Sequence, residues 1–473
     1  MEQKLGSVSR PLRVAVIGAG PSGFYAVGAL IARKDVNVSV DLYDRLPAPY
    51  GLVRYGVAPD HEHIRGVIRV YARTLADPRV RFFGNIAFGA DVTHEALRRY
   101  YDALIYAVGS ASDRKMGIPG EELRGSYSAT DFVGWYNAHP DYTDLKFDLT
   151  TAESAVVVGN GNVAMDVVRV LAKSSDELAQ TDVADHALAL LRQSRLKKIY
   201  MLGRRGPVQA AFTNPELREL SEIEVADVVV APRELELDPF SQAQLREHPD
   251  ATRNLETLKK YAVEGIKGRP RQIVIKFLTS PVEVMGLDER VSALKIERNE
   301  LRPNDKGALT AFGTGKFEAI AVDVIFRAIG YKGVPLPGVP YDARSGTIPN
   351  DRGRVLDPQT KQPLGGEYVV GWAKRGPSGV IGTNKPDALE TVELLLQDAP
   401  QLKPVADADA NPEAVSAYLQ QHCPQVVSHT DWQRLDALET QLGKTQGRPR
   451  VKFARVSEML DAIQRANGVG SVD

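Results

Sequence analysis

The chain has 473 residues, 43% apolar and 25% charged, which is enough for two or three globular domains and unlike a disordered or fibrous protein. Its 59 basic and 60 acidic side chains nearly cancel, so no overall charge favours nucleic acid or anionic lipid, and we expect neither as a partner. Cys423 is the only cysteine, which excludes disulfide scaffolds, iron–sulfur clusters held by this chain and a paired-cysteine redox centre.

Neither a signal peptide nor a membrane helix is predicted. Residues 1–11 are polar and lack the apolar run of a signal peptide. No run of about 18 apolar residues, the length that crosses a bilayer, occurs in the sequence. We therefore expect a cytoplasmic protein that does not bind membranes.

The first predicted unit is a strand, a glycine-rich turn, a helix and a second strand. Residues 12–17 are typical of a buried strand, residues 24–33 have apolar positions at helical spacing, and residues 36–43 alternate as the next strand. The second strand ends at Asp44, 26 positions after Gly18 and close to the offset of about 20 at which an acidic residue binds a ribose.

Three glycines give this turn its function. Gly18 permits the tight turn, Gly20 lets the backbone approach a pyrophosphate, and Gly23 lets helix and strand pack closely. The following helix N-terminus supplies amide donors and partial positive charge to the phosphates. The first unit is therefore predicted to bind a dinucleotide.

A second unit repeats this order but ends differently. Residues 154–158 are the predicted strand, the turn begins with Gly159 and Gly161, residues 165–173 are the helix, and residues 198–202 are the next strand. An extra helical segment, residues 174–195, lengthens the connection.

Arg204 and Arg205 stand where a cofactor without a ribose phosphate would want a carboxylate. Guanidinium groups match a phosphate dianion in geometry and charge, which favours NADP(H) over NAD(H). The alternative is an exposed basic turn.

The remaining elements predict an α/β fold of two nested Rossmann-like dinucleotide-binding domains, the glutathione-reductase-like two-domain flavoprotein architecture. Related strand endings at residues 103–109 and 322–330 close the two units. We expect a discontinuous FAD-binding domain, residues 1–110 and 331–473, around an NADP(H)-binding domain, residues 111–330. Residues 400–412 are a surface linker, and the helical tail from Asp431 carries no predicted chemistry.

Three long motifs together resemble adrenodoxin reductase and the bacterial ferredoxin–NADP reductases similar to it. They are residues 49–61, residues 203–207 and residues 371–381. The resemblance covers nearly the whole chain, including residues 447–449 of the tail, and is weakest between residues 403 and 430.

The resemblance implies FAD in the first unit and NADPH in the second. By position, the residues implied to contact FAD are Ser22, Asp44, Leu52, Ile86, Trp372, Gly379, Val380 and Ile381. Those implied to contact NADP(H) are Asn160, Gly161, Asn162, Val163, Arg204, Arg205, Glu216 and Gly379. Ser22 and Asp44 replace the alanine and glutamate usual in better-known members, which leaves FAD binding plausible.

The implied enzyme is a ferredoxin–NADP(+) reductase without a nucleophile or a metal. NADPH would pass a hydride to FAD, which would return two electrons singly, through a semiquinone, to a ferredoxin or similar small iron–sulfur protein. We expect a monomer.

His61 and Glu216 are the predicted catalytic residues near the nicotinamide, and both have structural alternatives. Thr213 and Glu216 fit a capping box of the next helix, and His61 fits a helix cap. Asp166 is a further candidate near the site, for which solvation on a helix surface is the favoured interpretation.

A basic docking surface for an acidic ferredoxin is predicted. Arg65, Arg69 and Arg73 are spaced by four residues, so they would share one helical face. The basic residues that would extend this surface are Arg218, Arg253, Lys259 and Lys260.

Three other functions are the alternatives to this one. A glutamate-synthase-like electron-distributing subunit would need cysteine clusters that this chain lacks, and a flavin monooxygenase lacks the matching long motifs. A non-catalytic NADP(H)-sensing module without flavin would be colourless.

Overall fold

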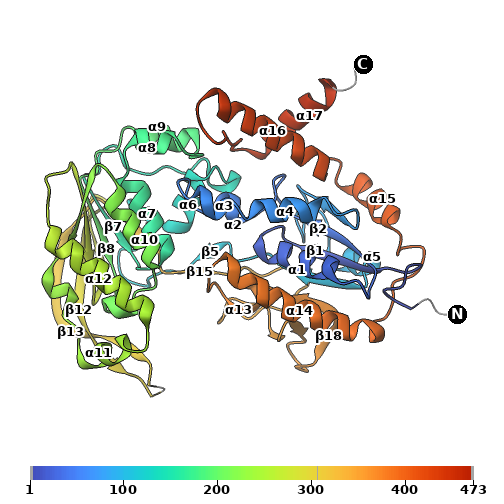
Figure 1. Ribbon diagram of the computed structural model, residues 1–473, viewed down its shortest axis with the longest axis horizontal. Coiled ribbons are helices and arrows are strands. Elements are labelled where there is room, and N and C mark those ends of the chain that lie inside the picture. Colours follow the sequence, from blue (N-terminus) through green and yellow to red (C-terminus); the bar gives the residue numbers. More distant parts are fainter. Residues whose placement is uncertain (1–3, 306, 470–473) are drawn as a thin grey trace.

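The computed structural model describes residues 4–305 and 307–469 (Figure 1). Its two largest sheets form the centres of two units. The first unit combines the start of the chain with its last third, blue and orange in Figure 1, and the second unit contains the middle of the chain, green and yellow. The predicted α/β fold with two nested nucleotide-binding sheets is confirmed.

The first unit contains a seven-stranded sheet. Its central strand β1 (Leu12–Ile17) pairs in parallel with β2 and β4, and all six β1 residues are buried. Helix α1 (Pro21–Ala32) packs against α14 (Asn384–Asp398). The sheet order is β16 (Asn350–Asp351), β17 (Arg354–Leu356), β18 (Pro363–Val369), β4 (Ala103–Tyr106), β1, β2 (Val38–Tyr43) and β3 (Val80–Phe83).

The second unit contains a six-stranded parallel sheet, on whose core helix α7 (Asn162–Ala172) packs. A long antiparallel sheet of β11 (Thr279–Leu287), β12 (Arg290–Pro303) and β13 (Leu309–Ala321) extends from it. The parallel sheet order is β6 (Ser126–Ser128), β14 (Val324–Arg327), β7 (Ser154–Val158), β8 (Lys198–Leu202), β10 (Arg271–Lys276) and β9 (Ala226–Val230).

The chain passes between the units at a short two-stranded ladder of β5 (Ser112–Asp113) and β15 (Tyr331–Lys332). This ladder lies beside the predicted domain boundaries at residues 110 and 331, which remain a proposal. The other helices are α2 (Leu52–Tyr55), α3 (Glu62–Arg65), α4 (Ile68–Leu75), α5 (His94–Tyr100), α6 (Ala129–Tyr136), α8 (Ser175–Ala179), α9 (Asp185–Leu191), α10 (Asn214–Glu219), α11 (Pro239–Leu245), α12 (Pro249–Glu264), α13 (Trp372–Arg375), α15 (Pro412–His422), α16 (His429–Thr445) and α17 (Val456–Val469).

The strands predicted at residues 12–17, 154–158 and 198–202 are confirmed at those bounds. Both fingerprint helices begin about one turn earlier than predicted, because Gly20 and Gly161 are already their N-caps. One prediction is wrong in part: Arg69 and Arg73 lie four residues apart on α4, but Arg65 does not share their helical face, since α3 ends at Arg65 and α4 begins at Ile68. Among the described residues, no helix is both long and apolar enough to cross a bilayer.

Candidate functional site

The first glycine turn is held tightly by protein contacts. Gly18 has a φ of +112°, and a Cβ there would lie 2.5 Å from the Ala107 carbonyl oxygen. Both carboxylate oxygens of Asp44 accept backbone hydrogen bonds at 2.9 Å, one from the Ala19 amide and one from the Leu46 amide. Burial raises the pKa of Asp44 despite these amides. Asp44 therefore fixes the turn, and the remaining lone pairs of its oxygens are the ones available to a ribose.

The residues predicted to contact FAD converge on this turn. Gly51, next to Leu52, approaches Gly20 so closely that a Cβ on Gly51 would lie 2.9 Å from the Gly20 Cα. Gly371, next to Trp372, faces Ser22, and the Ile86 amide donates to the Asp44 carbonyl at 2.9 Å.

Gly379, Val380 and Ile381 lie just before α14 in the same part of the first unit. A Cβ on Gly20 would meet nothing nearer than 4.0 Å, so the turn keeps open the space that a pyrophosphate needs. The residues present fit FAD.

The second glycine turn has the same backbone geometry. Gly159 has a φ of +136°, and a Cβ there would lie 2.2 Å from the Ala328 carbonyl oxygen, just as Gly18 meets Ala107. A Cβ on Gly161 would find its nearest neighbour, Ala211, at 3.9 Å. The Nδ2 atom of Asn160 is buried without a hydrogen-bond partner, so the turn has room and a donor for a ligand.

Arg204 and Arg205 follow β8 beside this turn. Hydrogen bonds hold their backbone carbonyls, since Asn299 Nδ2 donates to Arg204 at 2.8 Å and the Leu278 amide donates to Arg205 at 3.0 Å. Within residues 4–305 and 307–469, neither guanidinium has a carboxylate partner. Burial, and then the Arg204 charge, lowers the pKa of Arg205. A phosphate dianion fits two adjacent unpaired guanidinium groups.

The second turn also places α10. The Asn160 carbonyl accepts from the Ala211 and Phe212 amides at 3.0 and 3.1 Å, and Asn162 Oδ1 accepts from the Thr213 amide at 2.9 Å. Asn162 and Val163 are the first residues of α7. Glu216, which lies one turn further along α10, is thereby held beside α7.

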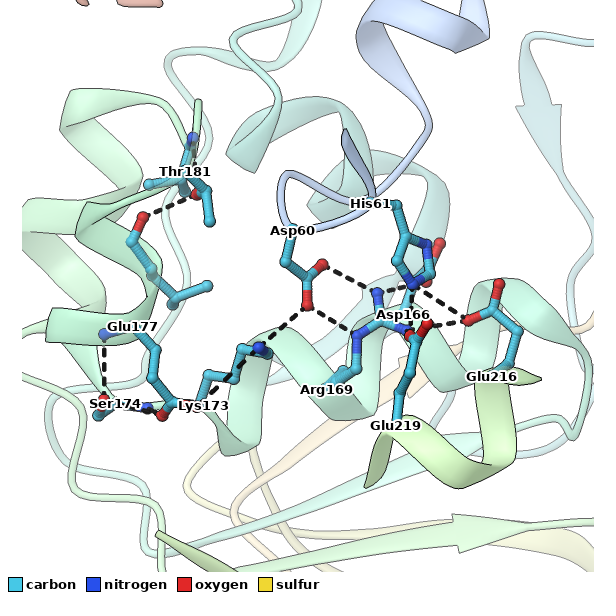
Figure 2. A network of polar contacts seen from close by, with 12 residues as sticks. Asp60, His61, Asp166, Arg169, Lys173, Ser174, Glu177, Thr181, Glu216 and Glu219 are labelled. Atoms are coloured by element: carbon cyan, nitrogen blue, oxygen red, sulfur yellow. Dashed lines mark hydrogen bonds and ion pairs between the residues drawn. The ribbon is translucent and has the colours of Figure 1, made fainter. Parts of the chain in front are cut away.

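A buried polar cluster joins the units where α10, α7 and the loop before α3 meet (Figure 2). Arg169 of α7 lies at its centre and is only 1% exposed. Its Nε and Nη2 donate to Asp60 at 2.8 and 2.9 Å, its Nη2 also donates to Asp166 at 3.0 Å, and its Nη1 donates to Glu216 at 2.9 Å. The Asp60 loop belongs to the first unit, so one guanidinium ties the two units together.

His61 completes the cluster. Its Nε2 lies 2.5 Å from Glu219 Oε2 and 3.5 Å from Glu216 Oε2, and its Nδ1 lies 3.6 Å from Asp166 Oδ1. Its side chain is 4% exposed. Figure 2 shows the ring pointing from the Asp60 loop toward α10.

Burial and hydrogen bonds shift the pKa values of the titratable groups in this cluster. Burial opposes charge on His61, yet the hydrogen bond to Glu219 and the nearby carboxylates raise the pKa of His61 above its ordinary value. Burial raises the pKa of Asp166 to about 7 and also raises the pKa of Glu216. These contacts therefore favour the protonated form of His61 beside Glu219, and burial favours the neutral form of Asp166.

His61, Glu216 and Glu219 bring ligand atoms within 4.8 Å of one another, a spacing that a metal ion would accept. Arg169 Nη1 already lies 2.9 Å from Glu216 and 3.1 Å from Glu219. Because this guanidinium supplies the positive charge, an ion-pair cluster explains the arrangement.

The structural alternatives for these residues are wrong. The Thr213 side chain makes no cap hydrogen bond and Glu216 contacts Arg169, so no capping box forms. His61 is the N-cap residue of α3, but its side chain does not cap the helix. Asp166 lies in the buried cluster and not on a solvated helix surface, because the Asp60 loop covers this face of α7.

The structure also divides the predicted docking surface. Arg65 is wrong as a docking residue, because its guanidinium pairs with Asp182 and is largely buried. Arg253 pairs with Asp250, and Lys260 pairs with Glu264. In the described part of the chain, no ion pair engages the exposed side chains of Arg69, Arg73, Arg218 and Lys259.

Sequence analysis missed Arg169, Asp60 and Glu219. Arg169 lies 109 positions from Asp60, so the contact has no local signal. Glu219 had a usable one, since it lies three residues after Glu216 and so shares that face of a helix.

Known proteins with similar sequences match nearly the whole chain. Residues 12–202 match the family model described as pyridine nucleotide-disulphide oxidoreductase. The NADPH-ferredoxin reductase FprA of Mycobacterium tuberculosis is 44% identical over 461 residues, which are 95% of this chain and 99% of that protein. The mitochondrial NADPH:adrenodoxin oxidoreductase of Arabidopsis thaliana is 39% identical, over 96% of each chain.

A solved structure of Mycobacterium tuberculosis FprA in complex with NADPH has a similar fold. The two match with a TM-score of 0.90 at 44% identity, over 96% of this chain and 100% of that one.

Proposed function

Because the chain belongs to the family of NADPH–ferredoxin reductases and adrenodoxin reductases, we propose that it is an FAD-dependent reductase that passes electrons between NADPH and a small iron–sulfur protein. The observation that supports this function is the presence of two unlike glycine turns, one in each of two units that a buried polar cluster joins. After the first turn and its helix, strand β2 leads to Asp44, whose carboxylate accepts hydrogen bonds from protein amides. In the second unit, β8 leads to Arg204 and Arg205, which have no carboxylate partner among the described residues.

Each turn supports a different cofactor contact. We propose that the amides at the start of α1 bind the FAD pyrophosphate and that Asp44 accepts from its ribose. Asn160, Asn162 and Val163 would bind the NADPH pyrophosphate, and Arg204 and Arg205 its 2′-phosphate. Bound FAD supplies the chemistry that couples a two-electron hydride donor to a one-electron acceptor.

The Arg169 cluster orders the residues that face the nicotinamide. Arg169 fixes Glu216, and Glu219 fixes the His61 ring, so both predicted catalytic side chains are preorganised. We propose that Glu216 orients the carboxamide and that the proton on His61 Nε2, shared with Glu219, balances charge at the site.

Electrons leave through another protein. Cys423, the single cysteine, is buried near the Asp91 carbonyl, so this chain cannot form the internal dithiol that disulfide reductases use. We propose a ferredoxin as the acceptor, docking on Arg69, Arg73 and Arg218, and a monomeric enzyme acting in the cytoplasm.

A coupled assay tests this function. The purified protein should be yellow and should reduce cytochrome c with NADPH only when a ferredoxin is present, after subtraction of direct reduction. A colourless protein that binds NADPH would instead support the NADP(H)-sensing module. A yellow protein that reduces cytochrome c equally with and without ferredoxin would contradict the proposed acceptor. Light scattering on a sizing column checks the monomer.

A further inference from the structure

Two segments to which no chemistry is assigned lie against each other in the structure. They are the segment between α7 and β8, which contains α8 and α9, and the tail after α16. Figure 1 shows α16 and α17 crossing the molecule above both units, with the turn after α16 directed toward α9. Because the tail follows the first unit in the chain and the α8–α9 segment belongs to the second, their contact joins the units.

Arg448 makes the first part of this contact. Its Nε donates to the Thr181 carbonyl at 2.9 Å, its Nη1 donates to Asp185 at 2.5 Å, and its Nη2 donates to the Val183 carbonyl. Arg448 is 7% exposed. The three acceptors surround the guanidinium in the geometry that its planar fork requires, so the bend between α8 and α9 is shaped around this side chain.

Lys452 makes the second part, at a junction of three segments. Its Nζ lies 2.9 Å from Asp182 Oδ2 of the second unit and donates to the Arg54 carbonyl of the first unit at 3.2 Å. Arg65 of the first unit pairs with the same Asp182. The Lys452 and Asp182 side chains are 1% and 5% exposed, so the tail and the first unit each bring a basic side chain to the same buried carboxylate.

The tail after α16 is also anchored in the first unit, through Glu439 of α16. Glu439 of α16 accepts from Arg54 Nη2 at 2.5 Å, from Arg450 Nη1 at 3.0 Å and from the Phe453 amide at 3.1 Å. Phe453 packs against the core of the first unit.

The next residue reaches the second unit. Ala454 packs against the core of that unit, and its carbonyl accepts from Thr143 Oγ1 at 2.8 Å. Consecutive tail residues therefore pack against the hydrophobic cores of different units.

This contact bears on the candidate site through the chain itself. Arg54 and Arg65 lie on the same short stretch of the first unit as Asp60 and His61, and α3 ends at Arg65, four residues after His61. This stretch is fixed to the second unit twice, by Asp60 to Arg169 and by Arg65 to Asp182. A shift at Asp182 would therefore move His61 relative to α10.

We propose that residues 448–455, which we call the clasp, fix the second unit against the first, and that Arg448 and Lys452 are positioning residues for hydride transfer. The inference rests on the proposed function, because under that function the two units that the clasp holds together would carry the flavin and the nicotinamide. Neither side chain belongs to the cofactor contacts, so the clasp acts on the rate of transfer and not on cofactor affinity.

The test compares Arg448→Met and Lys452→Met with wild type and with Arg434→Met. Arg434 is a matched control because it is an exposed tail arginine paired only within its own helix, with Asp431. Stopped-flow reduction of the bound flavin by saturating NADPH should slow roughly ten- to hundredfold in the clasp variants, since misplacement of this kind costs up to about two powers of ten. The dissociation constant for NADP+ and the FAD content should stay within about twofold of wild type, and Arg434→Met should match wild type throughout.

An unchanged reduction rate in both folded variants would overturn the clasp. So would a loss that is entirely a weaker affinity for NADP+. If Arg448→Met does not fold, Arg448→Lys and Asp185→Asn each remove part of the contact and are judged by the same outcomes.

Small-angle X-ray scattering separates failure of the clasp from failure of the proposed function. If NADPH does not reduce the wild-type flavin, the proposed function fails. Scattering then decides on the clasp alone: a larger radius of gyration in the clasp variants than in Arg434→Met supports it, and identical curves overturn it.

Discussion

The two glycine turns share a backbone and differ in what surrounds it. In both, the first glycine is pressed against the carbonyl of an alanine that follows the closing strand, Ala107 in the first unit and Ala328 in the second. Backbone amides of Ala19 and Leu46 satisfy the acidic residue of the first unit, whereas in the second unit the two guanidinium groups and Asn160 Nδ2 have no partner among the described residues. The difference teaches that a site whose acidic residue is already hydrogen-bonded by the protein suits a retained FAD. A site with free basic groups suits an exchangeable NADPH, whose phosphate supplies the missing negative charge.

Substituting the first glycine of each turn should separate the two cofactors most strongly. Both glycines have a positive φ, and holding an alanine in that conformation costs about 1–3 kcal/mol. The added Cβ would also clash with a backbone carbonyl at either position. We expect Gly18→Ala to be purified without FAD, and Gly159→Ala to keep its yellow colour but resist reduction by NADPH. Flavin absorbance and anaerobic NADPH titration measure the two effects. Loss of FAD in both variants would break the distinction between the turns.

Removing the two arginines sharpens the comparison further. Each charge-assisted hydrogen bond contributes about 1.5–3 kcal/mol, so removing one from each arginine in Arg204→Ala/Arg205→Ala should raise KM for NADPH roughly hundred- to ten-thousandfold and leave KM for NADH unchanged. Steady-state kinetics with both nucleotides measure this change. Arg434→Ala is the control, because that exposed arginine lies on α16 and pairs with Asp431 of its own helix. Equal losses with NADPH and NADH would contradict a phosphate-binding role.

The substitutions in the glycine turns do not test the buried cluster that joins the two units. The pH dependence of stability tests that cluster. His61 has a raised pKa, so its pair with Glu219 stabilises the folded state below about pH 6.5 and this stability is lost as pH rises through the higher folded pKa. In wild type, the free energy of unfolding should therefore fall by about 1–3 kcal/mol as pH rises through this pKa, and in His61→Gln this fall should be absent. Urea unfolding at several pH values measures both.

Asp166→Asn serves as the matched control. Because the pKa of Asp166 is raised to about 7, wild-type stability should also fall between about pH 4 and 7, and this substitution should remove that lower window only. A His61→Gln profile with the wild-type shape above pH 6.5 would show that the His61 pair does not titrate there.

The smallest effects are expected at the docking surface. Arg69→Gln, Arg73→Gln and Arg218→Gln should each lower kcat/KM for ferredoxin about threefold at low salt, because exposed charges mainly steer association. The rate of flavin reduction by NADPH should not change. Arg253→Gln should have less effect, since Asp250 already neutralises Arg253. A ferredoxin-dependent rate that does not fall as salt rises would contradict electrostatic docking.

Most of the fold could be predicted from the sequence, because its signals are local. Buried strands, glycine turns and the acidic or basic residues that follow β2 and β8 can each be recognised within a short stretch of sequence. The cluster was only half predictable. His61 and Glu216 came from motifs, whereas Arg169 and Asp60 meet only after folding, 109 positions apart. Arg65 was misplaced for the same reason, since its spacing from Arg69 and Arg73 is local and its partner Asp182 is not.

Anaerobic titration of the purified protein with NADPH and separately with NADH, followed by flavin absorbance, tests the central claim most directly. We expect about one equivalent of NADPH to bleach the flavin, and NADH to require at least roughly a hundredfold higher concentration, in keeping with the loss of the phosphate contacts. Equal bleaching by the two nucleotides, or no bleaching by either, would contradict the assignment of FAD to the first turn and NADPH to the second.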